Sequence, residues 1–219
     1  MLVRGSKFQA LGWGLGIALF WVAVSVHTLD AAALPRTARV KAVLDGDTIV
    51  LESGERVRYL GIDAPEVSHR DEPGDCYGEE AKTANRNWVL HRQVRLEYDR
   101  EKRDGYGRLL AYVLLEDETC VNAALLRGGF AWLLVPPAGL KRRAEFAEAQ
   151  REALRDRRGM WSACPHREEG SYLGNHRSQV FHRPDCPFAQ RIPRGYGATW
   201  ANRWEALEHG YRPCRRCKP

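Results

Sequence analysis

Two short turns near the start of the chain limit the folds that it can adopt. Runs of alternating and β-branched residues at 39–43, 48–51 and 55–60 are separated only by Asp45-Gly46 and Ser53-Gly54. Parallel neighbours would need a crossover of about a dozen residues or more, so these three strands must run antiparallel. The sequence therefore predicts a tightly connected meander and excludes a parallel sheet in this region.

The later elements complete a small α+β domain. Two further strands are predicted at 94–98 and 109–115, and three helices at 78–91, 121–127 and 141–158. Glycines follow the last two helices, as is typical of helix ends. Five strands with about three helices between and after them fit a closed Greek-key barrel better than an open sheet.

Charged residues form three motifs at the ends of predicted strands, at residues 45–48, 58–66 and 104–108. Two carboxylates, Asp47 and Asp63, suit a hard cation, and a third, Glu66, is placed to act as a base. Two arginines, Arg58 and Arg108, match the charge of a phosphate. These groups are the ones needed to hydrolyse a phosphodiester. Each motif alone could be an ordinary charged turn, but their convergence favours a catalytic site.

The order and spacing of these motifs resemble the thermonuclease (staphylococcal nuclease-like) family over residues 39–162. The resemblance implies an OB-fold barrel and a Ca²⁺-dependent nuclease that cuts DNA or RNA with little sequence preference. A rival interpretation is a non-catalytic OB-fold protein that binds nucleic acid or peptide. The complete set of charged residues favours the enzyme, because a pure binding protein need not keep it.

The resemblance also implies a role for each residue of the set. Asp47, Asp63 and the backbone carbonyl of Ala64 would be the Ca²⁺ ligands, and Glu66 the base that activates water. Arg58 and Arg108 would hold the scissile phosphate, with Tyr106 beside the nucleotide. The chain has Ala64 where the best-known members carry threonine, a change that a carbonyl ligand survives. It also has the segment 132–137 in place of a tyrosine-rich pattern.

The C-terminal region carries a second candidate site. One histidine and three cysteines occur as two close pairs, a suitable tetrahedral Zn²⁺ set: His182, Cys186, Cys214 and Cys217. A C-terminal tail of about 49 residues with few large apolar groups needs a cross-link such as a bound metal to fold. Disulfides or free thiols among these cysteines are the alternatives.

Residues 180–219 resemble the zinc-binding domain of the Ada-type DNA methyltransferase. In that family four cysteines hold zinc, and the first also accepts a methyl group from DNA. Because His182 stands at the acceptor position, we expect structural zinc without methyl transfer.

The net charge of the chain is unevenly distributed. The composition, 44% hydrophobic and 28% charged, is that of a globular protein of one or two domains. The whole charge of +6 falls in residues 171–219, which hold nine Lys/Arg against three Asp/Glu. A basic tail on a neutral domain suggests that the tail binds a polyanion, although a merely solvated tail is the alternative. We expect it to raise affinity for nucleic acid without taking part in cleavage.

The first 34 residues are typical of an export segment. Arg4 and Lys7 precede the uncharged stretch 8–26, and small residues follow at 31–33. We expect export to the periplasm or medium, with a membrane anchor as the alternative if the segment is not cleaved. The predicted organisation is this segment at 1–34, the barrel at 36–165, a linker at 166–179 and the zinc module at 180–219, in a monomer.

Three cysteines lie outside the candidate zinc site. In an exported protein two of them should pair. We favour Cys76, before the first long helix, with Cys164, after the last, which leaves Cys120 unexplained.

Overall fold

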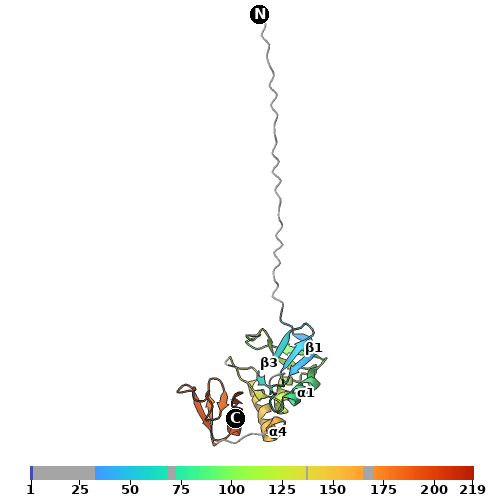
Figure 1. The fold of residues 1–219 in the computed structure, drawn as a ribbon. Coiled ribbons are helices and arrows are strands. Elements are labelled where there is room, and N and C mark those ends of the chain that lie inside the picture. Colours follow the sequence, from blue (N-terminus) through green and yellow to red (C-terminus); the bar gives the residue numbers. More distant parts are fainter. Residues whose placement is uncertain (2–32, 69–72, 137, 165–169) are drawn as a thin grey trace. The chain divides into compact units, whose positions relative to one another are not determined.

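The computed structural model describes residues 1, 33–68, 73–136, 138–164 and 170–219 (Figure 1). The chain divides into two units, residues 1–34 and 35–219, and every element below belongs to the second. The expected N-terminal apolar helix lies outside the described residues. Among the described helices, none combines the length and apolar character needed to cross a bilayer.

Five strands close into a barrel in the order β1-β2-β3-β6-β5. Their bounds are β1 (Thr37–Asp45), β2 (Thr48–Leu51), β3 (Arg56–Tyr59), β5 (Gln93–Glu97) and β6 (Leu109–Leu114). β1, β2 and β3 pair antiparallel through the two short turns, as the turn lengths require, and β3 pairs parallel with β6. The predicted five-stranded OB-fold barrel is confirmed.

Three helices of the barrel domain lie where the sequence predicts them, within a few residues at their ends. They are α1 (Gly78–Val89), α2 (Val121–Arg127) and α3 (Arg143–Arg155), and a short α4 (Met160–Ala163) follows. A two-residue pair, β4 (Ile62–Asp63) with β7 (Trp132–Leu133), was not predicted. Strands of this length show no periodicity, yet this pair holds Asp63 in place.

Helix α1 packs against the turn between β1 and β2. Its buried Asn85 accepts a hydrogen bond from the hydroxyl of Tyr59 (2.8 Å) and donates one to the carbonyl of Asp45 (3.1 Å). A Cβ at Gly46 would lie 2.6 Å from the Cβ of Ala64. Only glycine allows so close an approach, and the turn thereby brings Asp47 against the segment that follows β4.

The C-terminal region forms a separate four-stranded sheet with α5 (Arg203–Glu208). The strand order is β10-β8-β9-β11, with β8 (Tyr172–Asn175), β9 (Val180–His182), β10 (Gly197–Trp200) and β11 (Arg212–Pro213). Strand β8 falls within residues 166–179, the range expected to be a linker. The sheet therefore begins earlier than residue 180, where the resemblance to the Ada-type domain was expected to start.

One hydrophobic cluster joins the C-terminal sheet to the barrel domain. It combines side chains of α3 and α4 with those of the sheet and α5: Ala153, Leu154, Met160, Trp161, Tyr172, Phe181, Ala206, Leu207 and Tyr211. Buried Gln150 of α3 bridges the two regions, accepting from the amide of Leu133 (2.7 Å) and donating to the carbonyl of Leu207 (3.0 Å). The C-terminal region is thus packed onto the barrel domain through a shared core.

A disulfide joins Cys76 to Cys164. It ties the segment before α1 to the end of α4, and the favoured pairing is confirmed. Cys120 is a buried free thiol.

Asp99 anchors the start of the long segment between β5 and β6. Its carboxylate accepts hydrogen bonds from the hydroxyl of Tyr112 (2.7 Å) and the amides of Lys141 (2.8 Å) and Arg100 (2.9 Å). Burial favours a raised pKa, but these hydrogen bonds outweigh it and the pKa of Asp99 is lowered. The carboxylate therefore stabilises the fold in its ionised form.

We expect Asp99→Ala to lower the free energy of unfolding by about 1–3 kcal/mol at pH 7, because buried donors lose their acceptor. Since folding lowers the pKa, the contribution is complete above the ordinary value of 3.8 and is lost as the pH falls through the folded-state value. Urea unfolding at pH 7 and pH 3 measures this, with exposed Glu116→Ala as the control. An equal loss at both pH values would contradict the assignment.

Candidate active site and metal centre

Three of the predicted site residues meet at the rim of the barrel. Arg58 of β3 places its Nη1 2.5 Å from Oδ2 of Asp47, an ion pair without hydrogen-bond geometry, and its Nη2 donates to Oδ1 of Asp63 at 2.7 Å. Both aspartates are only 4% exposed. Two carboxylates that are 16 residues apart in sequence are thus held on one guanidinium.

The backbone after β4 completes the surroundings of Asp47. The amide of Ala64 donates to its Oδ2 (2.6 Å), and the hydroxyl of Thr48 donates to its Oδ1 (3.1 Å). Burial raises the pKa of Asp47 to about 8; Arg58 opposes this shift, while Asp45 and Asp63 add to it. Crowded, buried carboxylates of this kind are stabilised by a bound cation. The oxygen donors present fit a hard divalent ion.

Glu66 lies on the loop that follows β4. Its carbonyl accepts from the amide of Asp75 (2.8 Å), and its own amide donates to Oδ2 of Asp75 (3.3 Å). Its Oε1 accepts a hydrogen bond from Nη1 of Arg215 at 2.5 Å. The predicted base therefore points to the same place as Asp63, since the guanidinium of Arg215 also binds Asp63.

Arg215 is a site residue that the sequence reasoning missed. Its Nη2 donates to Oδ1 of Asp63 and its Nε to Oδ2 at 3.3 Å, and Arg212 adds a longer ion pair to Asp63 at 3.8 Å. Both arginines belong to the C-terminal sheet and its closing turn. The uneven charge of the chain was the only signal available, and it did not identify a residue.

Arg108 and Tyr106 lie on an exposed turn before β6. Asp104 accepts hydrogen bonds from the amides of both and from Nε of Arg108 (2.7 Å). Tyr106 is 88% exposed, and the Arg108 guanidinium lies over its ring. Since β6 begins opposite Val57, this turn adjoins the strand that carries Arg58. The described contacts of Arg108 remain within the turn, so its role at a phosphate stays a prediction.

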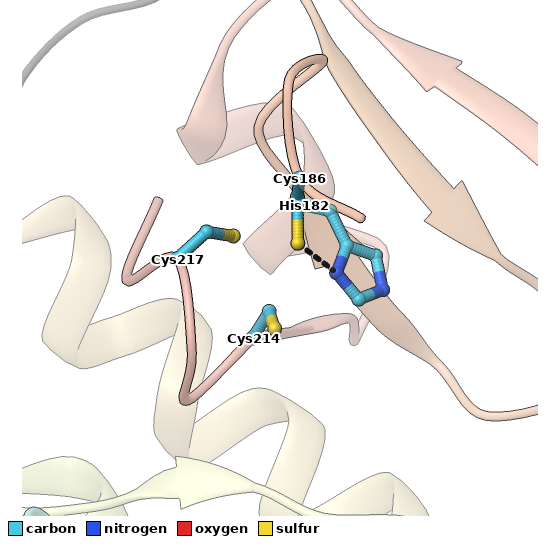
Figure 2. Close-up of side chains that lie close together, drawn as sticks. All are labelled: His182, Cys186, Cys214 and Cys217. Atoms are coloured by element: carbon cyan, nitrogen blue, oxygen red, sulfur yellow. Dashed lines mark hydrogen bonds between the residues drawn. The ribbon is translucent and has the colours of Figure 1, made fainter. Parts of the chain in front are cut away.

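The four candidate zinc ligands form one cluster (Figure 2). The ligand atoms of His182, Cys186, Cys214 and Cys217 all lie within 4.8 Å of one another, and Nδ1 of His182 is 3.6 Å from Sγ of Cys186. A tetrahedral ion with bonds of about 2.0–2.3 Å needs ligand atoms about 3.5–3.8 Å apart. The cysteines are free thiols, so the disulfide alternative is not adopted.

The surroundings of the cluster suit a metal. Burial, with a smaller effect from Arg212, lowers the pKa of His182. This shift favours the neutral imidazole, the form that binds metals. The amide of Arg183 donates to Sγ of Cys217 at 3.4 Å, as neighbouring amides do around metal thiolates.

Two family models match the chain in succession. Residues 56–163 match the staphylococcal nuclease homologue family, and residues 160–219 match the metal binding domain of Ada. The two matches meet at α4, where the shared core joins the two regions. The second match begins well before β8, in keeping with the place of that strand in the C-terminal sheet.

Curated relatives match the barrel domain. A thermonuclease of Staphylococcus intermedius is 41% identical over 125 residues, which are 56% of this chain and 74% of the relative. A thermonuclease of Staphylococcus hyicus is 34% identical over 130 residues, 58% of this chain and 76% of the relative. Endonuclease YncB of Bacillus subtilis is 38% identical over 127 residues, which are 54% of this chain and 58% of the relative. With this identity over most of the relatives' length, and with the barrel they imply observed, the chain belongs to the thermonuclease (staphylococcal nuclease) family.

Proposed function

We propose that the protein is an exported nuclease that requires Ca²⁺ and hydrolyses phosphodiester bonds of DNA, RNA or both with little sequence preference. The observation that carries this proposal is the cluster of Asp47, Arg58 and Asp63 at the barrel rim, with Glu66 directed to the same place. The activities for which the relatives are named, thermonuclease and endonuclease, support hydrolysis of nucleic acid.

The residues of the candidate active site would have three roles: binding the cation, accepting a proton and binding the phosphate. Asp47, Asp63 and the backbone at Ala64 would hold the cation, which when bound supplies positive charge against the phosphate oxygens. Glu66 accepts a proton from the attacking water. Arg58 holds the substrate phosphate in line and stabilises the charge that develops on it, and Arg108 does the same once its side chain leaves Asp104.

The C-terminal cluster would hold one structural Zn²⁺ through His182, Cys186, Cys214 and Cys217. Four protein ligands leave no open position, which is typical of a structural rather than a catalytic zinc site. Export through the N-terminal segment accords with the disulfide between Cys76 and Cys164, because such bonds persist in oxidising compartments. We propose a monomer that meets a membrane only if this segment is retained.

We expect hydrolysis to need a divalent cation, with Ca²⁺ better than Mg²⁺. Two carboxylates and a backbone oxygen on loops suit irregular coordination, whereas Mg²⁺ demands a near-ideal octahedron. Cleavage of plasmid DNA and of RNA is measured after chelation and after adding back each cation, using protein that lacks residues 1–34. Zinc content is measured in parallel, to separate the loss of the two metals.

Full activity in chelator, or strict Mg²⁺ dependence with inhibition by Ca²⁺, would contradict the proposed cation site. Binding of DNA or RNA without hydrolysis under any of these cations would favour the non-catalytic OB-fold protein instead.

A further inference from the structure

The zinc cluster holds Arg215 in a short turn between two of its ligands. Cys214 and Cys217 flank this turn, the amide of Cys214 donates to the carbonyl of Phe181, and the amide of Lys218 donates to the carbonyl of Cys214 (both 2.9 Å). The turn is therefore fixed by backbone contacts and, with metal bound, by two thiolates. The side chain of Arg215 reaches out of the C-terminal region to Asp63 and Glu66.

A second ion pair, directly after this turn, connects the C-terminal region to the loop that carries Glu66, the candidate base. Nζ of Lys218 pairs with Asp75, the residue whose amide and carboxylate brace the backbone of Glu66. The C-terminal region thus contacts the active site twice, at the carboxylates and at the loop that carries one of them.

A cavity of about 210 Å³ lies next to these contacts, between the barrel domain and the C-terminal region. Asp63 and Asp75 border it, and they are outnumbered by four basic side chains that line it: Arg183, Arg203, Arg215 and Lys218. Buried N–H groups of Trp132, Trp161 and Arg203 also belong to its lining residues and find no acceptor among the described residues. Such a lining suits a ligand that is anionic and rich in acceptor oxygens, as a sugar-phosphate backbone is.

We propose that the C-terminal zinc region forms one wall of the active site and that Arg215 binds a phosphate of the substrate strand. This inference rests on the proposed nuclease function and differs from the expectation that the tail takes no part at the site of cleavage. The guanidinium is planar and doubly donating, which matches phosphate as well as carboxylate. A cation held at Asp63 would compete with Arg215 for that carboxylate and would leave the guanidinium fork for a substrate phosphate.

Two observations favour a substrate-binding role for Arg215 over an inhibitory role, in which the C-terminal region would block the active site and have to move away. The side chain of Arg215 is 52% exposed, so the substrate can reach it without any movement of the backbone. The region that carries it shares a buried core with α3 and α4 and is bridged by Gln150. Lifting the whole region from the site would break that core, whereas rotating one side chain would not.

Binding of a labelled single-stranded DNA oligonucleotide in Ca²⁺ tests the proposal without any need for cleavage. Three proteins are compared: Glu66→Gln alone, and the same variant with Arg215→Ala or with Arg216→Ala. Arg216 lies exposed on the same turn, so its removal changes the charge equally. We expect Arg215→Ala to raise Kd about 10–100-fold, since a charged hydrogen bond is lost, and to lower the salt slope by about one phosphate contact. Arg216→Ala should stay within about threefold, because a lone exposed charge contributes little.

Kinetics with Glu66 intact give a second readout. Arg215→Ala should raise KM about tenfold or more, and Arg215→Lys should lie between it and the native chain, because lysine keeps the charge but not the fork. Zinc content and the unfolding midpoint of each variant show whether the turn is intact. If Arg215→Ala disturbs the turn, Arg215→Lys is compared with Arg216→Ala and the native chain in its place.

Equal Kd and KM for Arg215→Ala and Arg216→Ala would overturn the proposal, and so would a rise in kcat/KM, which would identify Arg215 as an inhibitory plug. If the native chain hydrolyses nothing, the proposed function fails, while the binding comparison still decides whether Arg215 contacts nucleic acid.

Discussion

Replacing Glu66 with glutamine is expected to lower kcat by about 10²–10⁴-fold, the usual contribution of a positioned general base. The amide keeps the size of the side chain and can still accept a hydrogen bond from Arg215, but it cannot take a proton from water. The Glu66 side chain is 45% exposed, so the fold should not depend on its charge. Initial rates on a short single-stranded DNA at saturating Ca²⁺ measure the effect.

Glu79→Gln is the matched control, since Glu79 is an exposed carboxylate in the first turn of α1. It should leave kcat within a few-fold of the native value. If Glu66→Gln also changed kcat by only a few-fold, while folding and Ca²⁺ binding were unaltered, the base would have to be sought elsewhere at the rim.

Loss of one zinc ligand is expected to have the second large effect. Cys214→Ser should reduce bound zinc from one equivalent to nearly none and unfold the C-terminal sheet. Zinc binding to such small regions contributes on the order of 10 kcal/mol to their folding, more than the core of so short a tail can replace. Elemental analysis and the unfolding midpoint measure the two consequences.

The shared core makes this prediction more specific. Met160 and Trp161 of the barrel domain belong to the same buried cluster as Phe181 and Leu207 of the C-terminal region. The variant should therefore lower the stability of the barrel domain as well, instead of producing an independent early transition. Cys120→Ala is the control, because Cys120 is also a buried free thiol but lies outside the cluster. Stoichiometric zinc in Cys214→Ser, or a metal-free native chain with a disulfide among these cysteines, would contradict the site.

The strands of the barrel were predictable because their signals are local. Alternation of residues and two turns of minimal length are enough to make β1, β2 and β3 antiparallel neighbours. The pair formed by β4 and β7 was not predictable, because two residues carry no period and the partners are about 70 positions apart. This pair nevertheless holds Asp63 at the rim.

The candidate active site was predictable only in part. Asp47, Arg58, Asp63 and Glu66 lie within 20 positions, so the meander places them near one another, while the pairing of β4 with β7 fixes Asp63 at the rim. The zinc set was likewise visible as two close pairs of ligands, and the cluster confirms that they meet. Within each pair the spacing along the chain reports the spacing in space, whereas the two pairs of the zinc set meet only because β9 and β11 lie side by side.

The sequence alone thus predicted the barrel, the family and the two candidate sets of ligands, since each rests on motifs that can be seen along the chain. Only the tertiary structure decided that Arg215 forms an ion pair with Asp63, from which it is separated by 152 residues in sequence. It also decided that the zinc region packs into a common core with α3 and α4. Such contacts depend on how apolar faces of separate elements fit together, and no local period or motif encodes which faces will meet.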